Sequence, residues 1–131
     1  MKRVLITMSA DVLTMGHVKI LQYAKSLGFV AVAVDSDELI KQRKGKDRPF
    51  NVLKDRMDFL YALKSVDEVF SFNSEKELVD ICELFVPDIR VVGSDWKDKE
   101  IVGAEYCKEI LYFNRIEPYS TTRILNYGKS K

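Results

Sequence analysis

Short apolar runs alternate along the chain with segments in which apolar residues recur every three or four positions. The short runs predict five strands, at Val4–Thr7, Phe29–Val34, Val66–Phe72, Ile89–Val92 and Ile110–Phe113. The periodic segments predict helices, at 16–28, 52–63, 74–85 and 100–107. Because strands and helices alternate, the pattern predicts an α/β fold. The second strand is apolar on both faces, as is typical of a central strand in a parallel sheet.

Individual residues mark the ends of several predicted helices. Gly28 follows the last periodic position of the first helix and is a natural C-terminal cap. Ser74 can cap the third helix, with Glu77 placed to complete a capping box. Ser120 or Thr121 can cap a final helix that starts near Thr122.

Length and composition narrow the class of protein. The length of 131 residues predicts a single domain, 1–131, with a core of its own. The net charge of +1 argues against nucleic-acid binding, and no apolar run is long enough to cross a membrane. Cys82 and Cys107 lack metal-ligand spacing, so we expect free thiols, no metal held by the protein, and a reducing, cytoplasmic setting.

The segment between the first strand and the first helix is the strongest candidate for a binding site. It reads Thr7-Met-Ser-Ala-Asp-Val-Leu-Thr-Met-Gly-His17. A strand, a turn and a helix N-terminus bind phosphate through free backbone N–H groups and the helix dipole. Gly16 allows close backbone approach, and His17, the one histidine of the chain, brings an imidazole to the helix start.

Basic residues cluster after the second strand, between Asp35 and Pro49. Such a run is ordinarily a solvated, mobile loop. It follows the carboxyl end of a strand, however, where open α/β sheets bind ligands. We therefore expect Lys44 and Lys46 in particular to act on a triphosphate. Arg56, in the first turns of the next helix, is a surface residue by default.

The fourth strand ends in Gly93-Ser-Asp-Trp96, again at a carboxyl end of the sheet. Glycine gives access to the backbone, while Asp95 and Trp96 offer polar and stacking contacts, which favours a site over a plain loop. Near the C-terminus, Arg115 lies close to the last predicted helix N-terminus.

The tetrad Thr14-Met-Gly-His17 resembles the H-x-G-H or T-x-G-H motif of a nucleotidyltransferase superfamily, at the same place after the first strand. Upstream, Met8-Ser-Ala-Asp11 stands where the family usually has G-T-F-D. The resemblance covers nearly the whole chain. It implies a Rossmann-like three-layer sandwich with a five-stranded, mostly parallel sheet, and a homodimer.

Two branches of that superfamily compete. Arg115-Ile-Glu-Pro-Tyr-Ser-Thr-Thr122 and Gly93-Ser-Asp-Trp96 resemble R-T-E-G-I-S-T-T and G-D-D-W of glycerol-3-phosphate cytidylyltransferases. Lys44-Gly-Lys-Asp-Arg-Pro-Phe-Asn51 and Glu100-Ile-Val-Gly103 resemble K-G-x-x-R-P-x-N and E-I-V-G of D-glycero-β-D-manno-heptose 1-phosphate adenylyltransferases. The first branch implies CTP, which we favour here, with a phosphorylated polyol as acceptor. The second implies ATP and a phosphorylated sugar.

The resemblance also implies a role for each matching residue. His17, and more weakly Thr14, would donate to the α-phosphate of the nucleoside triphosphate, while Lys44 and Lys46 would hold phosphates. Mg²⁺ would arrive with the triphosphate, and Asp11 could contact this ion or simply cap the turn. The resemblance implies nucleotide binding by a larger set, namely Thr7, Met8, Ser9, Asp11, Gly16, Arg56, Gly93, Asp95, Trp96, Arg115, Ser120, Thr121 and Thr122.

A different class of function stays open. The first histidine and the G-T-F pattern of the superfamily are both missing, so the chain could be a nucleotide-binding homologue with little turnover. Losing one donor to a transition-state oxyanion costs roughly 100- to 1,000-fold in rate. Pyrophosphate release would separate the enzyme from such a binding protein.

Overall fold

Each apolar run predicted as a strand forms one in the computed structural model, which describes residues 1–114. The strands are β1 (Arg3–Met8), β2 (Phe29–Asp35), β3 (Glu68–Phe72), β4 (Ile89–Gly93) and β5 (Glu109–Phe113). They form one sheet in the order β3-β2-β1-β4-β5, and every pair of neighbours is parallel. The helices are α1 (Met15–Leu27), α2 (Asp37–Lys44), α3 (Leu53–Tyr61) and α4 (Glu75–Phe85).

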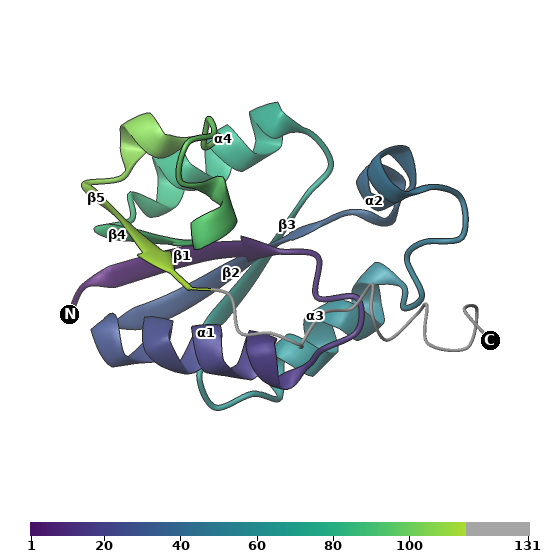
Figure 1. Ribbon diagram of the computed structural model, residues 1–131, viewed down its shortest axis with the longest axis horizontal. Coiled ribbons are helices and arrows are strands. Elements are labelled where there is room, and N and C mark those ends of the chain that lie inside the picture. Colours follow the sequence, from purple (N-terminus) through teal and green to yellow (C-terminus); the bar gives the residue numbers. More distant parts are fainter. Residues whose placement is uncertain (115–131) are drawn as a thin grey trace.

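Helices cover both faces of the sheet, so the predicted three-layer α/β fold is confirmed. Figure 1 shows α1 and α3 on one face and α4 on the other. The alternation of valine and alanine along β2 explains how both faces are buried. Val30, Val32 and Val34 pack in the cluster that contains Leu21 of α1 and Leu60 of α3. Ala31 and Ala33 join the opposite cluster, with Leu78 and Phe85 of α4.

Gly28 ends α1 as predicted, and its place beside the sheet explains why a glycine is needed. A Cβ atom at this position would lie 2.1 Å from the carbonyl oxygen of Lys2. The same carbonyl accepts a hydrogen bond of 2.8 Å from the backbone N–H of Phe29, at the start of β2. The absent side chain therefore lets the first two strands begin side by side.

Two predicted segments differ from the structure. The basic segment is not simply a mobile loop, because residues 37–44 form α2. Ser36 caps this helix by accepting from the N–H of Leu39, and acidic residues in its first turn and basic residues in its last complement the helix dipole. The prediction of a helix over 100–107 is also wrong. Only Ala104–Tyr106 forms a 3₁₀ turn, after Gly103 with φ of +83°.

The predicted helix near Thr122 lies outside the described residues. Within residues 1–114, no helix combines the length and the apolar character that a membrane span requires.

Candidate active site

A cavity of about 690 Å³ opens at the carboxyl ends of the central strands. It lies where the strand order reverses, between β1, which leads to β2 on one side, and β4 on the other. In open α/β sheets this reversal leaves a crevice where ligands bind. The volume is within the range of pockets that hold small molecules. Residues from β1, the start of α1, the end of α2 and the loop after β4 line this cavity.

His17 and Thr14 form a capping box at the first turn of α1, on the wall of the cavity. The Thr14 hydroxyl accepts from the N–H of Gly16 at 3.2 Å, and His17 Nδ1 accepts from the N–H of Thr14 at 3.0 Å. Because Nδ1 accepts a backbone hydrogen bond, the proton of the neutral imidazole is on Nε2. The cap therefore presents His17 as a donor through Nε2. Thr14, predicted as a weaker phosphate donor, lines the cavity and serves as the cap.

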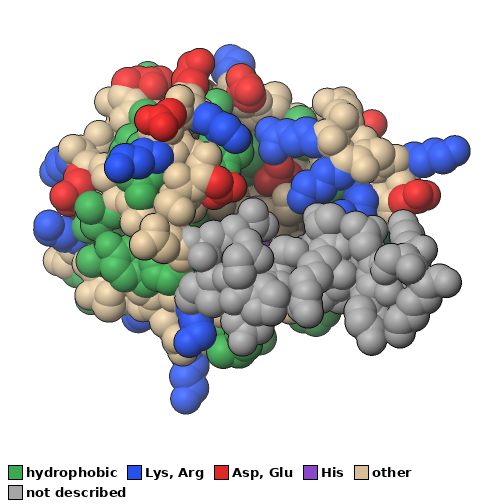
Figure 2. All heavy atoms as spheres, viewed as in Figure 1, with side chains coloured by type: hydrophobic (Ala, Val, Ile, Leu, Met, Phe, Trp, Pro, Cys, Tyr) green, Lys and Arg blue, Asp and Glu red, His purple; other side chains and the backbone are tan. Residues whose placement is uncertain are grey.

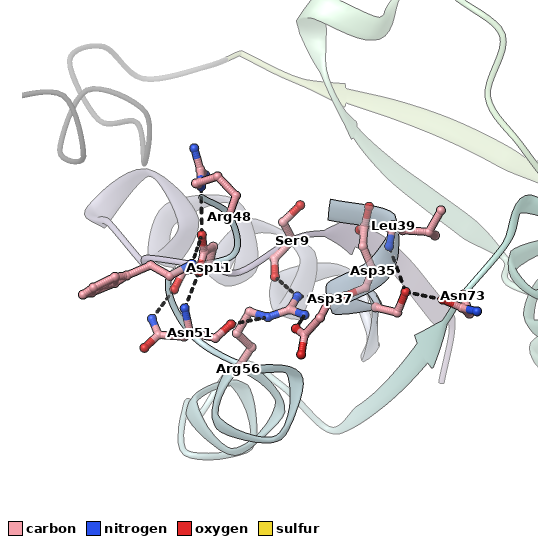
Figure 3. Close-up of polar contacts among 11 residues, drawn as sticks. Ser9, Asp11, Asp35, Asp37, Leu39, Arg48, Asn51, Arg56 and Asn73 are labelled. Atoms are coloured by element: carbon pink, nitrogen blue, oxygen red, sulfur yellow. Dashed lines mark hydrogen bonds and ion pairs between the residues drawn. The ribbon is translucent and has the colours of Figure 1, made fainter. Parts of the chain in front are cut away.

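Asp11 anchors the loop that follows α2. Its buried carboxylate accepts from Arg48 Nε at 3.1 Å and from the N–H groups of Phe50 and Asn51 at 2.9 and 2.8 Å. The Asn51 amide also donates to the Asp11 carbonyl oxygen. Burial alone would raise the pKa of Asp11, but these hydrogen bonds and the Arg48 charge outweigh it and lower the pKa. Figure 3 shows Asp11 between Arg48 and Asn51.

Of the two open roles for Asp11, the structure favours the turn. Its carboxylate oxygens are occupied by the loop that contains Arg48 and Asn51, although the residue also lines the cavity. In residues 1–114, no group of three His, Cys, Asp or Glu side chains is placed to hold a metal ion.

Basic side chains gather on the α2 side of the molecule, as Figure 2 shows. Lys44 lines the cavity, as predicted, whereas Lys46 is exposed and is not among the lining residues. Partial desolvation, reinforced by the nearby charge of Arg48, lowers the pKa of Lys44. Arg43 lines the cavity too, but it donates to the buried carboxylate of Asp35 at 2.5 Å.

Arg56 is not the surface residue that its place in the helix suggested. Its side chain is 0% exposed and does not line the cavity. Three backbone carbonyls accept from its guanidinium, those of Ser9 and Asp35 at 2.8 Å and that of Asn51 at 3.0 Å. The carboxylate of Asp37 accepts at 2.6 Å. Arg56 therefore ties the end of β1, the end of β2 and the anchored loop together (Figure 3).

The loop after β4 reaches the cavity as the sequence predicted. Gly93, Asp95 and Trp96 all line it. A Cβ atom on Gly93 would lie 2.8 Å from the Asp95 carboxylate, so glycine lets that side chain fold back on the strand. Trp96 is about half exposed, with the Lys99 amine 5.2 Å from its ring centroid.

The structure thus brings together most of the predicted site. The lining residues that were predicted are Thr7, Met8, Ser9, Asp11, Thr14, Gly16, His17, Lys44, Gly93, Asp95 and Trp96. Four others, Arg115, Ser120, Thr121 and Thr122, lie outside the described residues.

Sequence reasoning missed three arginines that line the cavity, Arg43, Arg48 and Arg90. Arg90 is 3% exposed and lies in β4, where its Nη1 donates to the carbonyl of Val102 at 2.8 Å. A charged residue within an apolar strand is rarely buried without a partner. That anomaly in the sequence could have indicated Arg90 as a site residue.

Comparison with known proteins identifies the family. The model of the cytidylyltransferase-like family matches residues 8–126, so the chain belongs to this family of nucleotidyltransferases. The predicted resemblance to that superfamily is confirmed.

Curated relatives agree with this assignment. The chain is 41% identical to the bifunctional protein HldE of a Nitratiruptor species, over 98% of this chain and 28% of that protein. It is 40% identical to the protein of the same name from Helicobacter hepaticus, over 88% of this chain and 24% of the relative. The chain therefore spans about a quarter of the length of these relatives.

The solved structure has the same fold. It is a lipopolysaccharide core biosynthesis protein from Thermoplasma volcanium, with a TM-score of 0.71 and 24% identity. The match covers 89% of this chain and 99% of that one.

Proposed function

We propose that the protein transfers a nucleoside monophosphate from ATP to a sugar 1-phosphate of the heptose type and releases pyrophosphate. The family supports the class of reaction, and the HldE relatives support the adenylyltransferase branch over the CTP branch that the sequence alone favoured. The observation that carries the proposal is His17, fixed by the Thr14 cap on the wall of a cavity that Lys44 and Arg48 also line.

The reaction needs no nucleophile from the protein. An oxygen of the acceptor phosphate bonds to the α-phosphorus as the bond to the oxygen bridging to the β-phosphate breaks. Pyrophosphate leaves with that bridging oxygen. Negative charge grows on the α-phosphate oxygens, and His17 Nε2–H would donate to one of them. Lys44 would attract the phosphates, and holding both substrates in line would lower the barrier further.

Mg²⁺ would supply charge neutralisation on the triphosphate. Asp11 and Asp35 of the cavity already pair with Arg48 and Arg43, and within residues 1–114 no group of three His, Cys, Asp or Glu side chains is placed to hold a metal ion. Phosphate oxygens and water would therefore be the main ligands of such an ion, which fits an ion that arrives with its nucleotide.

CTP with glycerol 3-phosphate is the second candidate. The motif that favours it within the described residues is Gly93-Ser-Asp-Trp96, which lines the cavity where a base and ribose could lie. A homodimer and a reducing, cytoplasmic setting belong to the proposal as well. Light scattering should give twice the mass of one chain.

A pyrophosphate-release assay with Mg²⁺ tests the proposal. ATP and CTP are each combined with heptose 1-phosphate and with glycerol 3-phosphate. His17→Ala is compared with Lys19→Ala, an exposed residue of the same helix. We expect turnover with ATP and heptose 1-phosphate, a loss of roughly 100-fold or more in His17→Ala, and none in Lys19→Ala.

Other outcomes would redirect the proposal. Turnover with CTP and glycerol 3-phosphate alone would establish the second candidate. Nucleotide binding by calorimetry without turnover in any pairing would favour the binding homologue. Activity that survives His17→Ala in a folded variant would refute the role of His17.

A further inference from the structure

Arg48 carries a buried donor that the fold does not use. Its side chain is 13% exposed, and Nη2 is buried without a hydrogen-bond partner among the described residues. Nearly all buried polar atoms in proteins have partners, so an orphaned guanidinium nitrogen calls for an explanation. Arg48 lines the cavity, which means that a ligand could supply the partner.

The fold holds this guanidinium in place from one side only. Asp11 accepts from Nε at 3.1 Å, and the carboxylate is itself held by the N–H groups of Phe50 and Asn51. An arginine fixed through Nε still presents its outer nitrogens in a planar fork that matches a phosphate oxyanion. Asp11 is therefore the positioning residue and Arg48 the residue left available.

Lys44, close to Arg48 in the cavity, forms no ion pair of its own among the described residues. Arg43, on the same side of the cavity, is neutralised by Asp35, and the buried Arg56 by Asp37. Arg48 pairs with Asp11 but still repels Lys44, and after desolvation this repulsion is the next cause of the lowered pKa of Lys44. An anion bound between these two cations would relieve the repulsion.

We propose that Arg48 binds a phosphate oxyanion of a substrate through its Nη2 end, with Asp11 as the residue that positions it. The source is either the polyphosphate of the nucleotide or the phosphate of the acceptor. Naming these substrates rests on the proposed function. The presence of an oxyanion site does not.

Calorimetric titration with two probes, tripolyphosphate and inorganic phosphate, tests the site without any turnover. Arg48→Gln is compared with Lys41→Gln, which removes a positive charge from α2 at an exposed position outside the cavity. We expect Arg48→Gln to weaken the affinity for at least one probe by roughly 10- to 100-fold, and Lys41→Gln by less than about threefold. Loss for tripolyphosphate alone assigns the site to the nucleotide, and loss for phosphate alone assigns it to the acceptor.

Equal affinities of Arg48→Gln and Lys41→Gln for both probes would overturn the proposal. If Arg48→Gln does not fold, Arg48→Lys takes its place, since it keeps a cation beside Asp11 but loses the planar fork. Wild-type affinity for both probes in Arg48→Lys would then overturn the proposal. If the Arg48 variants lose anion binding while the wild-type protein turns over no substrate pair, the oxyanion site is supported and the proposed reaction is refuted.

Discussion

Replacing the carboxylate of Asp11 by an amide should strongly destabilise the protein. The Asp11 side chain is 1% exposed and accepts three hydrogen bonds, from Arg48 Nε and from the N–H groups of Phe50 and Asn51. In Asp11→Asn, the amide NH₂ must face at least one of these donors. Arg48, itself largely buried, also loses its counter-charge.

The size of the effect follows from these contacts. Hydrogen bonds to a charged group contribute about 1.5–3 kcal/mol each, and breaking a buried ion pair costs about 3–5 kcal/mol in total. We expect a loss near the lower end, about 3 kcal/mol, because Asn keeps one acceptor oxygen. Domains of this size have about 5–15 kcal/mol of stability, so the urea midpoint should fall by roughly 1–3 M.

Urea unfolding followed by circular dichroism measures this loss. Asp58→Asn is the matched control, because Asp58 forms an exposed ion pair with Lys54 within α3 and should leave the midpoint nearly unchanged. If Asp11→Asn lowers the midpoint no more than Asp58→Asn, Asp11 is not the anchor of the loop.

The pH dependence of the folding stability gives a second test of the hydrogen bonds to Asp11. Folding lowers the pKa of Asp11 below its ordinary value of 3.8. The stabilisation from the charged carboxylate is therefore fully present above that value and is lost as the pH falls through the lower, folded-state pKa. The difference in stability between wild type and Asp11→Asn should narrow below about pH 4.

Three further predictions concern other parts of the molecule. Arg56→Leu should cost about 3–5 kcal/mol in thermal unfolding, since it leaves buried carbonyls and a carboxylate without their donor, and a loss under about 1 kcal/mol would contradict that role. Gly28→Ala should cost about 1–3 kcal/mol, because its Cβ meets the Lys2 carbonyl, and an unchanged melting temperature would refute this contact. A hydrogen bond from the Cys82 thiol lowers the pKa of Cys107 to about 7. The rate of iodoacetamide labelling at Cys107, followed by mass spectrometry, should therefore rise through pH 7. Cys82, whose pKa is raised, should be modified later. A labelling rate at Cys107 that rises only above about pH 8 would argue against the lowered pKa.

The sequence was most informative where structure depends on neighbours along the chain. The apolar run at 29–34 indicated a central strand because both faces of β2 are covered. The turn before α1 could be recognised because it lies between an apolar run and a periodic segment, and the structure adds that Thr14 and His17 form a capping box there. Local spacing thus predicted the core of the site as well as the fold.

Contacts between distant segments were beyond such reasoning. Arg56 can be buried because backbone carbonyls at the ends of two strands accept hydrogen bonds from it. Both carbonyls are distant in sequence, so the residues around Arg56 do not predict its burial. Arg48 likewise depends on Asp11, which is far away along the chain. The 100–107 segment has helical periodicity, but Gly103 lies against Cys82, where a Cβ would come within 2.5 Å of the sulfur. Packing there overrides local preference.

The order of the strands in the sheet has a consequence for how the chain folds during synthesis. One edge of strand β1 pairs with β2, which is the next strand in the sequence. The other edge pairs with β4, where Val4 lies opposite Ile89, so its partner is synthesised much later. Until β4 is made, a nascent chain presents an open apolar edge at β1, which is a template for pairing with other chains. The insertion of β4 closes that edge and brings Val91, Val92 and Gly93 to the wall of the cavity in the same step. Protection from aggregation and assembly of the binding site therefore depend on one late docking event.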